Sequence, residues 1–285
     1  MPPDDAPRRL AAAGGAAYVQ KMRFPLPFLS RPPVVSVVRL SGTIAARSRA
    51  LSDETVGPLL ERAFRRGRTA AVALVVNSPG GSPVQSSMIG ARLRRLSEDR
   101  RIPVTAYVED VAASGGYWLA SAADDIVVDE SSIVGSIGVI YASFGFVRAI
   151  DRLGVERRVH TAGRSKSFLD PFRPETDQDL ERLRALQDPI HRAFIDHVKA
   201  RRGAKLPDGR DLFTGDIWVG RQAIEVGLAD RVGHLVPDMK ARFGDKVRFA
   251  TFGPRRPLLS RFGIRLAEDL AQTAEDRLAF ARFGL

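Results

Sequence analysis

The sequence contains no cysteine, and histidine is scarce, with four residues in a chain of 285. Without cysteine the chain can form no disulfide bond and can bind no metal through thiolates. The absence suits an oxidising or a reducing compartment equally, so it carries no information on location.

Long hydrophobic runs are also missing. No stretch reaches the roughly 18–20 apolar residues that span a bilayer. The apolar run from Leu10 to Val19 is short, and Asp4 and Asp5 stand where a secretory signal carries positive charge. We therefore expect a cytoplasmic protein without a transmembrane segment or signal peptide, with peripheral attachment to the inner membrane as an open alternative.

The balance of charge is strongly basic, with 44 Lys and Arg against 33 Asp and Glu and a formal net charge of +11. Such a surface could attract nucleic acid or anionic lipid. The basic residues are scattered, however, and no nucleic-acid-binding motif accompanies them. We interpret them as a solvated surface and expect no nucleic-acid partner.

Composition and patterning divide the chain into three parts. Residues 1–33 are rich in proline and are predicted to form an N-terminal tail. Residues 34–235 carry alternating strand and helix patterns and form the predicted main domain. Residues 236–285 are predicted to be a C-terminal helical extension, in which the amphipathic segment 258–285 could dock on the body, on another subunit or on a membrane.

Strands and helices are predicted to alternate within the main domain. Apolar runs predict strands at 34–38, 70–76, 104–108, 126–128 and 137–140, and helical spacing predicts helices at 54–66, 84–97, 117–123 and 177–202. Thr176 or Asp177 should cap the last helix, and Pro189 should kink or divide it. The alternation indicates an α/β fold with a largely parallel sheet and crossover helices.

Two glycine pairs follow two of the predicted strands. Gly80 and Gly81 follow one strand, and Gly115 and Gly116 follow the next, directly after Ser114. Glycine lets backbone N–H groups approach a ligand closely, and sites of α/β proteins lie at the carboxyl ends of parallel strands. The two loops could therefore aim two amides at one developing oxyanion, although a Gly-Gly pair is more often only a turn.

Ser114 is the candidate nucleophile because it stands where a strand meets a short helix. A serine needs a neighbouring base to remove its proton. None of the four histidines, His160, His191, His197 and His234, has a sequence context that marks it as this partner.

Lys166 lies in a loop of small residues, and a lysine acts as a base when burial lowers its pKa towards neutrality. On composition alone a lysine is far more often a solvated charge, and spacing does not show that Lys166 reaches Ser114.

Several blocks resemble the S49 peptidases, the group that includes signal peptide peptidase A, protease IV and SohB. They occur in the family's order between about residues 34 and 233, which is roughly two thirds of the chain: Asn77-Ser78-Pro79-Gly80-Gly81, Ala112-Ala113-Ser114-Gly115-Gly116-Tyr117, Gly135-Ser136-Ile137-Gly138-Val139, Gly163 to Lys166 with Asp170-Pro171-Phe172, Phe213-Thr214-Gly215 and Gly227-Leu228-Ala229-Asp230.

The resemblance implies a ClpP/crotonase-like spiral of ββα units and a serine endopeptidase that needs no metal or organic cofactor. It implies Ser114 as nucleophile, Lys166 as base and Ser136 as a hydroxyl that orients the lysine. The amides of Gly81 and Gly115 would form the oxyanion hole. By the same resemblance we expect unfolded or hydrophobic peptides as substrates, remnant signal peptides among them, and a homo-oligomer that in some relatives shares its sites between subunits.

The chain departs from the family pattern by lacking a transmembrane helix and a tandem duplication, which leaves the signal-peptide substrate and membrane location open. Two other functions also stay open. A crotonase-type acyl-CoA hydratase or isomerase would use the same two amides, with Glu109 and Asp110 as candidate carboxylates. A non-catalytic oligomeric scaffold would bind peptides or membranes through its C-terminal helix.

Overall fold

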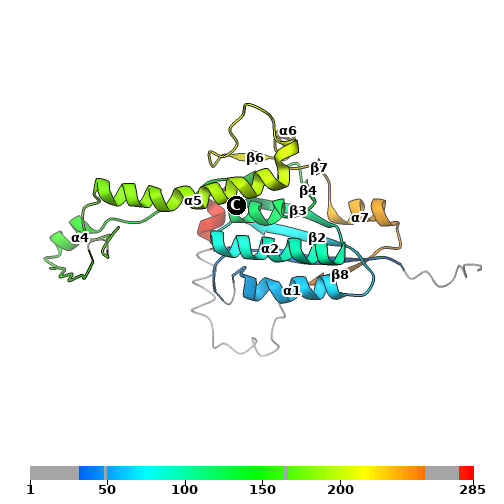
Figure 1. The fold of residues 1–285 in the computed structure, drawn as a ribbon, viewed down its shortest axis with the longest axis horizontal. Helices are drawn as coiled ribbons and strands as arrows, with labels where there is room; N and C mark the ends of the chain where they lie inside the picture. The colour runs from blue at the N-terminus through cyan, green and yellow to red at the C-terminus, as the bar shows by residue number, and fades with distance from the viewer. Residues whose placement is uncertain (1–31, 48–49, 164–165, 254–275) are drawn as a thin grey trace, which may run out of the picture. The chain divides into compact units, whose positions relative to one another are not determined.

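A computed structural model of the protein describes residues 32–47, 50–163, 166–253 and 276–285. Within these residues the centre of the fold is an eight-stranded sheet with helices packed on it (Figure 1). In chain order the elements are β1 (Val34–Ser41), α1 (Asp53–Arg65), β2 (Thr69–Ser78), α2 (Pro83–Arg100), β3 (Val104–Ala113), α3 (Gly115–Ser121), β4 (Asp125–Val128), β5 (Ile133–Gly135), α4 (Val147–Arg152), α5 (Asp177–Arg202), η1 (Gly203–Lys205), β6 (Ile217–Val219), α6 (Arg221–Glu225), β7 (Arg231–Val232), α7 (Leu235–Phe243) and β8 (Arg248–Phe252).

The sheet is parallel apart from one pair of strands, as the sequence predicts. The main strand order is β6-β5-β3-β2-β1-β8, and β4 pairs with β3 and β7 outside this path. Only β5 and β6 run antiparallel among the described pairs. Because β2 and β3 are parallel neighbours, with Ser78 opposite Ala112, the loops that follow them begin side by side.

Both faces of the central strands are buried, which explains their nearly continuous apolar sequences. One face packs against α1, α2 and α3, and the other packs against α7. Along β1 the alternation is visible, since Val38 and Leu40 belong to the first core and Val35 and Val37 to the second.

Helix α5 has the predicted bounds and runs without a break through Pro189. Thr176 caps it, and the Thr176 and Asp179 side chains each accept a hydrogen bond from the other's backbone amide. Its C-terminal half packs on α3, where the Phe194 and Trp118 rings stack with centroids 5.0 Å apart.

The predicted strand at 137–140 is wrong, because the fifth strand is β5 at Ile133–Gly135. Gly135 and Ser136 both have positive φ, at 110° and 52°, and this departure from extended backbone ends β5 at Gly135. The apolar run at 137–140 is therefore loop and not sheet.

The C-terminal part contains α7 and also strand β8, which pairs with β1 and which the sequence reading did not anticipate. Residues 276–281 are helical. The predicted tail as far as residue 31 and the stretch 254–275 of the amphipathic segment lie outside the described residues. No helix in the part of the chain that the structure describes has the length and apolarity to cross a membrane.

A buried ion pair joins α5 to the turn before β7. Arg202, whose side chain is 2% exposed, donates to Asp230 at 2.8 Å, and Lys205 and the Ile126 amide donate to the same carboxylate. Burial raises the pKa of Asp230, but these hydrogen bonds outweigh it, so the pKa lies below its ordinary value.

We expect Asp230→Asn to lower the free energy of unfolding by about 3 kcal/mol, because it leaves Arg202 buried without its counter-charge. A lowered folded-state pKa gives stability that is fully present above the unfolded pKa of about 3.9 and is lost as pH falls below it. The urea midpoints of the wild type and of Asp230→Asn should therefore differ at pH 7 and converge as the pH falls below about 4. The exposed Asp208→Asn is the matched control, and an unchanged urea midpoint for Asp230→Asn would contradict this role.

Candidate active site

The loops after β2 and β3 pack against each other so closely that only glycine fits. A Cβ on Gly80 would lie 2.8 Å from the Ser114 Cβ and 2.8 Å from the Gly115 nitrogen. A Cβ on Gly115 would lie 2.4 Å from the Ser86 hydroxyl. The two glycine pairs singled out in the sequence thus meet at one point, as their strand positions predict.

The segment around Ile44 holds the first loop in place. Ile44 donates to the Gly80 carbonyl at 2.9 Å and accepts from the Ser82 amide at 2.7 Å. This pairing turns the Gly81 N–H away from Ile44. A Cβ on Gly81 would lie 2.1 Å from the Ile44 carbonyl oxygen, and the φ of Gly81 is 141°, so this position requires glycine.

Gly81 and Gly115 each present an unpaired amide. Within the described residues neither N–H has a hydrogen-bond acceptor in the protein, and the Gly81 nitrogen lies 3.4 Å from the position of a Cβ on Gly115. Gly115 is the first residue of α3, where a helix leaves its N–H groups unsatisfied. The pair can therefore donate two hydrogen bonds to one ligand oxygen.

Ser114 adopts a conformation that L-residues rarely take, with φ 51° and ψ −121°. Its amide donates to the Gly135 carbonyl at 2.8 Å, and its carbonyl accepts from Trp118 at 3.0 Å. Although Ser114 occupies the N-cap of α3, its hydroxyl makes no capping hydrogen bond. A strained residue with an uncommitted hydroxyl is typical of a functional position.

Ser136 lies beside Ser114 at the end of β5. Its φ is also positive, and its amide donates to the Asp216 carbonyl at 2.6 Å. Ser114 and Ser136 line one pocket of about 420 Å³, together with Pro79, Gly81, Gly138, Val139, Ile140, His191, Thr214, Gly215 and Arg282. An adjoining apolar hollow at Ser114 is lined by Pro83, Trp118, Ile190 and Phe194, among others.

Lys166 is not among the residues that line either hollow. It is exposed, and its amide donates to the Gly163 carbonyl at 3.2 Å. The structure thus brings together Ser114, Ser136, Gly81 and Gly115 of the predicted site, and it does not bring Lys166 to them within one chain.

Lys166 belongs to the segment 141–176, which we call the arm. Figure 1 shows its helix α4 beyond the N-terminal end of α5, whereas the other end of α5 packs on α3. The arm is held by internal contacts, such as the ion pair between Arg157 and Asp170 and the hydrogen bond from the Phe146 amide to the Pro171 carbonyl.

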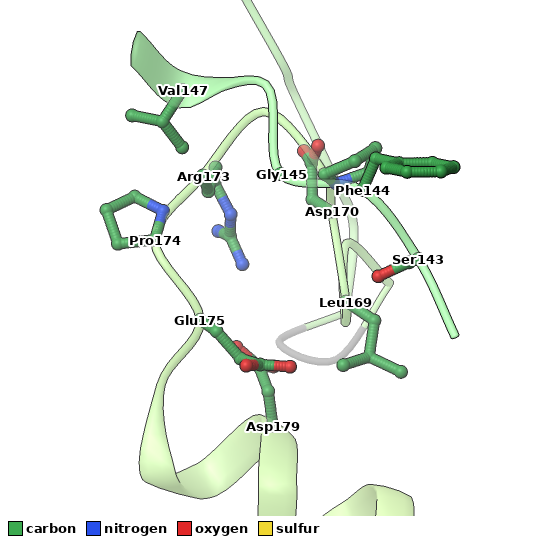
Figure 2. Close-up of a pocket in the computed structure, with 11 residues that line it drawn as sticks. Ser143, Phe144, Gly145, Val147, Leu169, Asp170, Arg173, Pro174, Glu175 and Asp179 are labelled. Atoms are coloured by element: carbon green, nitrogen blue, oxygen red, sulfur yellow. The ribbon is translucent and has the colours of Figure 1, made fainter. Parts of the chain in front are cut away.

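The arm also encloses a hollow of about 290 Å³, into which Arg173, Glu175 and Asp179 point (Figure 2). Asp170 and Ser143 line it as well, and Ser114 and Ser136 do not. The arm and the Ser114 pocket are therefore separate sites of one chain.

His191 and Arg282 line the pocket, and sequence reasoning singled out neither. His191 lies on the face of α5 that lines the pocket, and its Nε2 is 3.1 Å from the Ile137 carbonyl oxygen. His197 has a structural role, stacked on Trp118, and burial lowers its pKa to about 4. Helical spacing alone does not distinguish the two, because they lie on one helix six residues apart.

The carboxylates of the acyl-CoA alternative are engaged elsewhere. Glu109 pairs with Arg39 at 2.6 Å, and Asp110 accepts a hydrogen bond from the Asn77 amide group. Neither residue lines the Ser114 pocket. Among the described residues no group of three or more His, Asp or Glu side chains could hold a metal ion.

Comparison with known proteins assigns both the fold and the family. The serine-to-alanine and lysine-to-alanine mutant structures of the 1510-N membrane-bound stomatin-specific protease each superpose with a TM-score of 0.50 at 14% identity. They cover 79% and 86% of this chain, and 99% of their own. These structures confirm the ClpP/crotonase-like α/β fold. The model of peptidase family S49 matches residues 97–242, so the chain belongs to peptidase family S49, as its motifs predict.

Relatives from bacteria and plants carry the similarity over most of the chain. Protease 4 of Haemophilus influenzae is 30% identical over 76% of this chain and 35% of its own length. The chloroplastic serine protease SPPA of Arabidopsis thaliana is 28% identical over 70% of this chain and 31% of its own.

A Brucella melitensis protein named Na(+)/H(+) antiporter NhaA is 42% identical over 97% of this chain, which spans 42% of that protein. The chain thus covers less than half of each of these relatives. Because the S49 match lies within the shared segment, the transporter name is not carried over to this chain.

If Ser114 stores backbone strain, Ser114→Gly should be more stable than Ser114→Ala by about 1 kcal/mol, because glycine adopts positive φ without steric cost. Thermal or urea unfolding of the two variants measures the difference. Ser131, which is exposed and whose φ is not positive, is the control, and there glycine should be the less stable variant. If Ser114→Gly is instead less stable than Ser114→Ala, as expected for glycine at Ser131, Ser114 is unstrained.

Proposed function

We propose that the protein is a serine endopeptidase with a Ser/Lys dyad, in which Ser114 is the nucleophile and Lys166 the general base. The observation that carries this proposal is the uncommitted, strained Ser114 beside the two unpaired amides of Gly81 and Gly115. Acyl transfer requires a nucleophile and two aligned donors in this arrangement, and the S49 family match agrees with that chemistry.

The reaction proceeds in two halves. Neutral Lys166 accepts the Ser114 proton while the Ser114 oxygen attacks the scissile carbonyl, and the Gly81 and Gly115 amides donate to the resulting oxyanion. Lys166 then returns the proton to the leaving amine, which departs with the C-terminal product. Water, deprotonated by Lys166, hydrolyses the acyl-enzyme and regenerates Ser114, while the Ser136 hydroxyl orients the lysine amine.

Lys166 is proposed to reach Ser114 from a second copy of the chain. Within one chain it is exposed on the arm and absent from the Ser114 pocket. The arm and its flanks expose large apolar side chains, among them Ile140 at 68%, Phe144 at 80% and Leu153 at 76%. Val84 and Met88 of α2, just beyond the Gly81 loop, are also exposed. Apolar surfaces of this kind favour association, and a head-to-tail contact between two different surfaces gives a ring when its rotation closes.

Hydrophobic or unfolded peptides are the proposed substrates. Trp118, Ile190 and Phe194 line a small hollow of about 20 Å³ beside Ser114, and this apolar surface favours contact with an apolar substrate residue. A peptide must also be extended to place its carbonyl against the two amides. Remnant signal peptides combine both properties and are one candidate class.

A fluorophosphonate probe should label Ser114, and Ser114→Ala should abolish labelling, because only an activated serine attacks this reagent. Ser143→Ala, which removes an exposed serine of the arm, should label like the wild type. Incubation with a peptide and an acyl-CoA in parallel should consume the peptide alone. Turnover of the acyl-CoA, or no labelling of the assembled protein, would favour the hydratase or the scaffold.

The shared site predicts that two inactive variants complement each other. Ser114→Ala and Lys166→Ala should each lose at least about 10³-fold in kcat, because each removes a member of one catalytic unit. Co-assembled in equal amounts they should recover about a quarter of wild-type activity, since each half of a site is intact in half of the copies.

The control for this experiment co-assembles Ser114→Ala with the double variant Ser114→Ala/Lys166→Ala. This mixture contains no intact Ser114 and should stay inactive. His191→Gln tests the competing base and should retain activity. Activity of Lys166→Ala alone, or its dependence on His191, would contradict the dyad. Failure of the co-assembled variants to recover would place Lys166 and Ser114 of one chain together.

A further inference from the structure

Hydrogen bonds hold the C-terminal residues 276–285 beside the Ser114 pocket. Asp276 Oδ1 accepts hydrogen bonds from the Thr43 amide at 3.2 Å and from the Thr43 hydroxyl at 2.7 Å. Thr43 directly precedes Ile44, the residue that pairs with the Gly80–Gly81 loop. The terminal segment is therefore attached to the same backbone that positions the Gly81 amide.

This attachment places Arg282 at the pocket. Arg282 lines the same hollow as Ser114 and Ser136, although it is far from both in sequence. Its side chain is exposed, and among the described residues it forms no ion pair. The residues that line the hollow include no carboxylate, so the guanidinium keeps its N–H donors for a ligand.

We propose that Arg282 is a specificity-determining residue that binds a carboxylate of the peptide, so that the enzyme prefers peptides with an acidic group near the scissile bond. This inference rests on the proposed peptidase function and names a substrate class for that site. The planar guanidinium matches a carboxylate in a bidentate geometry, which favours it over a neutral amide. An Asp or Glu side chain and the free C-terminus of a peptide provide the same chemistry.

The adjoining apolar hollow gives the preference a second component. Trp118, Ile190 and Phe194 line the apolar hollow at Ser114, whereas Arg282 lines the more polar pocket with Thr214 and Ser136. A peptide that spans Ser114 therefore contacts an apolar surface at this small hollow, which measures about 20 Å³, and places its acidic group against Arg282.

Hydrolysis by the full-length assembled protein tests the proposal with three sets of fluorogenic peptides. The first carries Glu scanned along an apolar peptide with an amidated C-terminus, the second carries Gln at the same positions, and the third is the Gln set with a free C-terminal carboxylate. Arg282→Gln should reduce kcat/KM about five- to tenfold for the acidic peptides, mainly through KM, and leave the amidated Gln peptides unchanged. The first and third sets distinguish a side-chain carboxylate from a terminal one.

Arg277→Gln is the matched control, because Arg277 is an exposed arginine of the same terminal segment 276–285 that does not line the pocket. It should behave like the wild type. Arg282→Glu should reverse the preference towards Lys-containing peptides, and added salt should weaken the wild-type preference. An equal effect of Arg282→Gln on acidic and neutral peptides, or no acidic preference in the wild type, would overturn the proposal.

A binding measurement separates this inference from the peptidase proposal. Ser114→Ala cannot turn over, so fluorescence anisotropy with labelled Glu and Gln peptides measures binding alone. The Glu peptide should bind about five- to tenfold more tightly, and the Ser114→Ala/Arg282→Gln double variant should lose the difference. A binding preference without hydrolysis by the wild type would refute the peptidase and support Arg282. Hydrolysis or binding with no acidic preference would refute Arg282 alone.

Discussion

The contact between the backbones of the Gly80–Gly81 and Ser114–Gly116 loops is the constraint on which the candidate site depends. The two loops approach each other to distances that no Cβ would tolerate, because a Cβ on Gly80 would lie 2.8 Å from the Ser114 Cβ and from the Gly115 nitrogen. The approach is possible because β2 and β3 are parallel neighbours that end at the same edge. Since Ile44 pairs with the first loop and Gly135 holds Ser114, four segments converge on one pair of amides.

At Ser114 the backbone conformation that the candidate site requires is one that lowers stability. A rotation of the Ser114 backbone to negative φ would release this strain, but Gly135 fixes its amide and α3 fixes its carbonyl. The buried neighbours of Ser114, including Tyr117 and Trp118, stabilise α3 against the sheet. The core thus stabilises a conformation that local preferences disfavour, which is the usual condition for a preorganised site.

Much of this arrangement could be predicted from the sequence. The central strands and the two glycine loops follow from apolar runs that end in glycine, and the bounds of α5 follow from a capping threonine and a terminal glycine. Ser114 could be singled out because a serine between a strand and a glycine pair exposes its hydroxyl. Lys166 depended on family resemblance, since nothing in its neighbourhood shows which serine it serves.

The parts that could not be predicted depend on long-range contacts. The apolar run at 137–140 has the composition of a strand, and only the backbone conformation at Gly135 and Ser136 shows that the strand ends earlier. Strand β8 is short and joins the sheet only because the edge of β1 is available. Arg282 reaches the pocket through the hydrogen bonds between Asp276 and Thr43, residues more than two hundred positions apart.

The exposed arm has a consequence for when the protein can act. If Lys166 reaches Ser114 only across a contact between copies, a newly synthesised chain folds without a working site and cannot damage its neighbours. Peptidase activity would then depend on the degree of assembly. It would rise more steeply than the protein concentration, because dilution dissociates the copies that form each site. Expression level and local crowding would thereby set a threshold below which the cell holds an inert precursor.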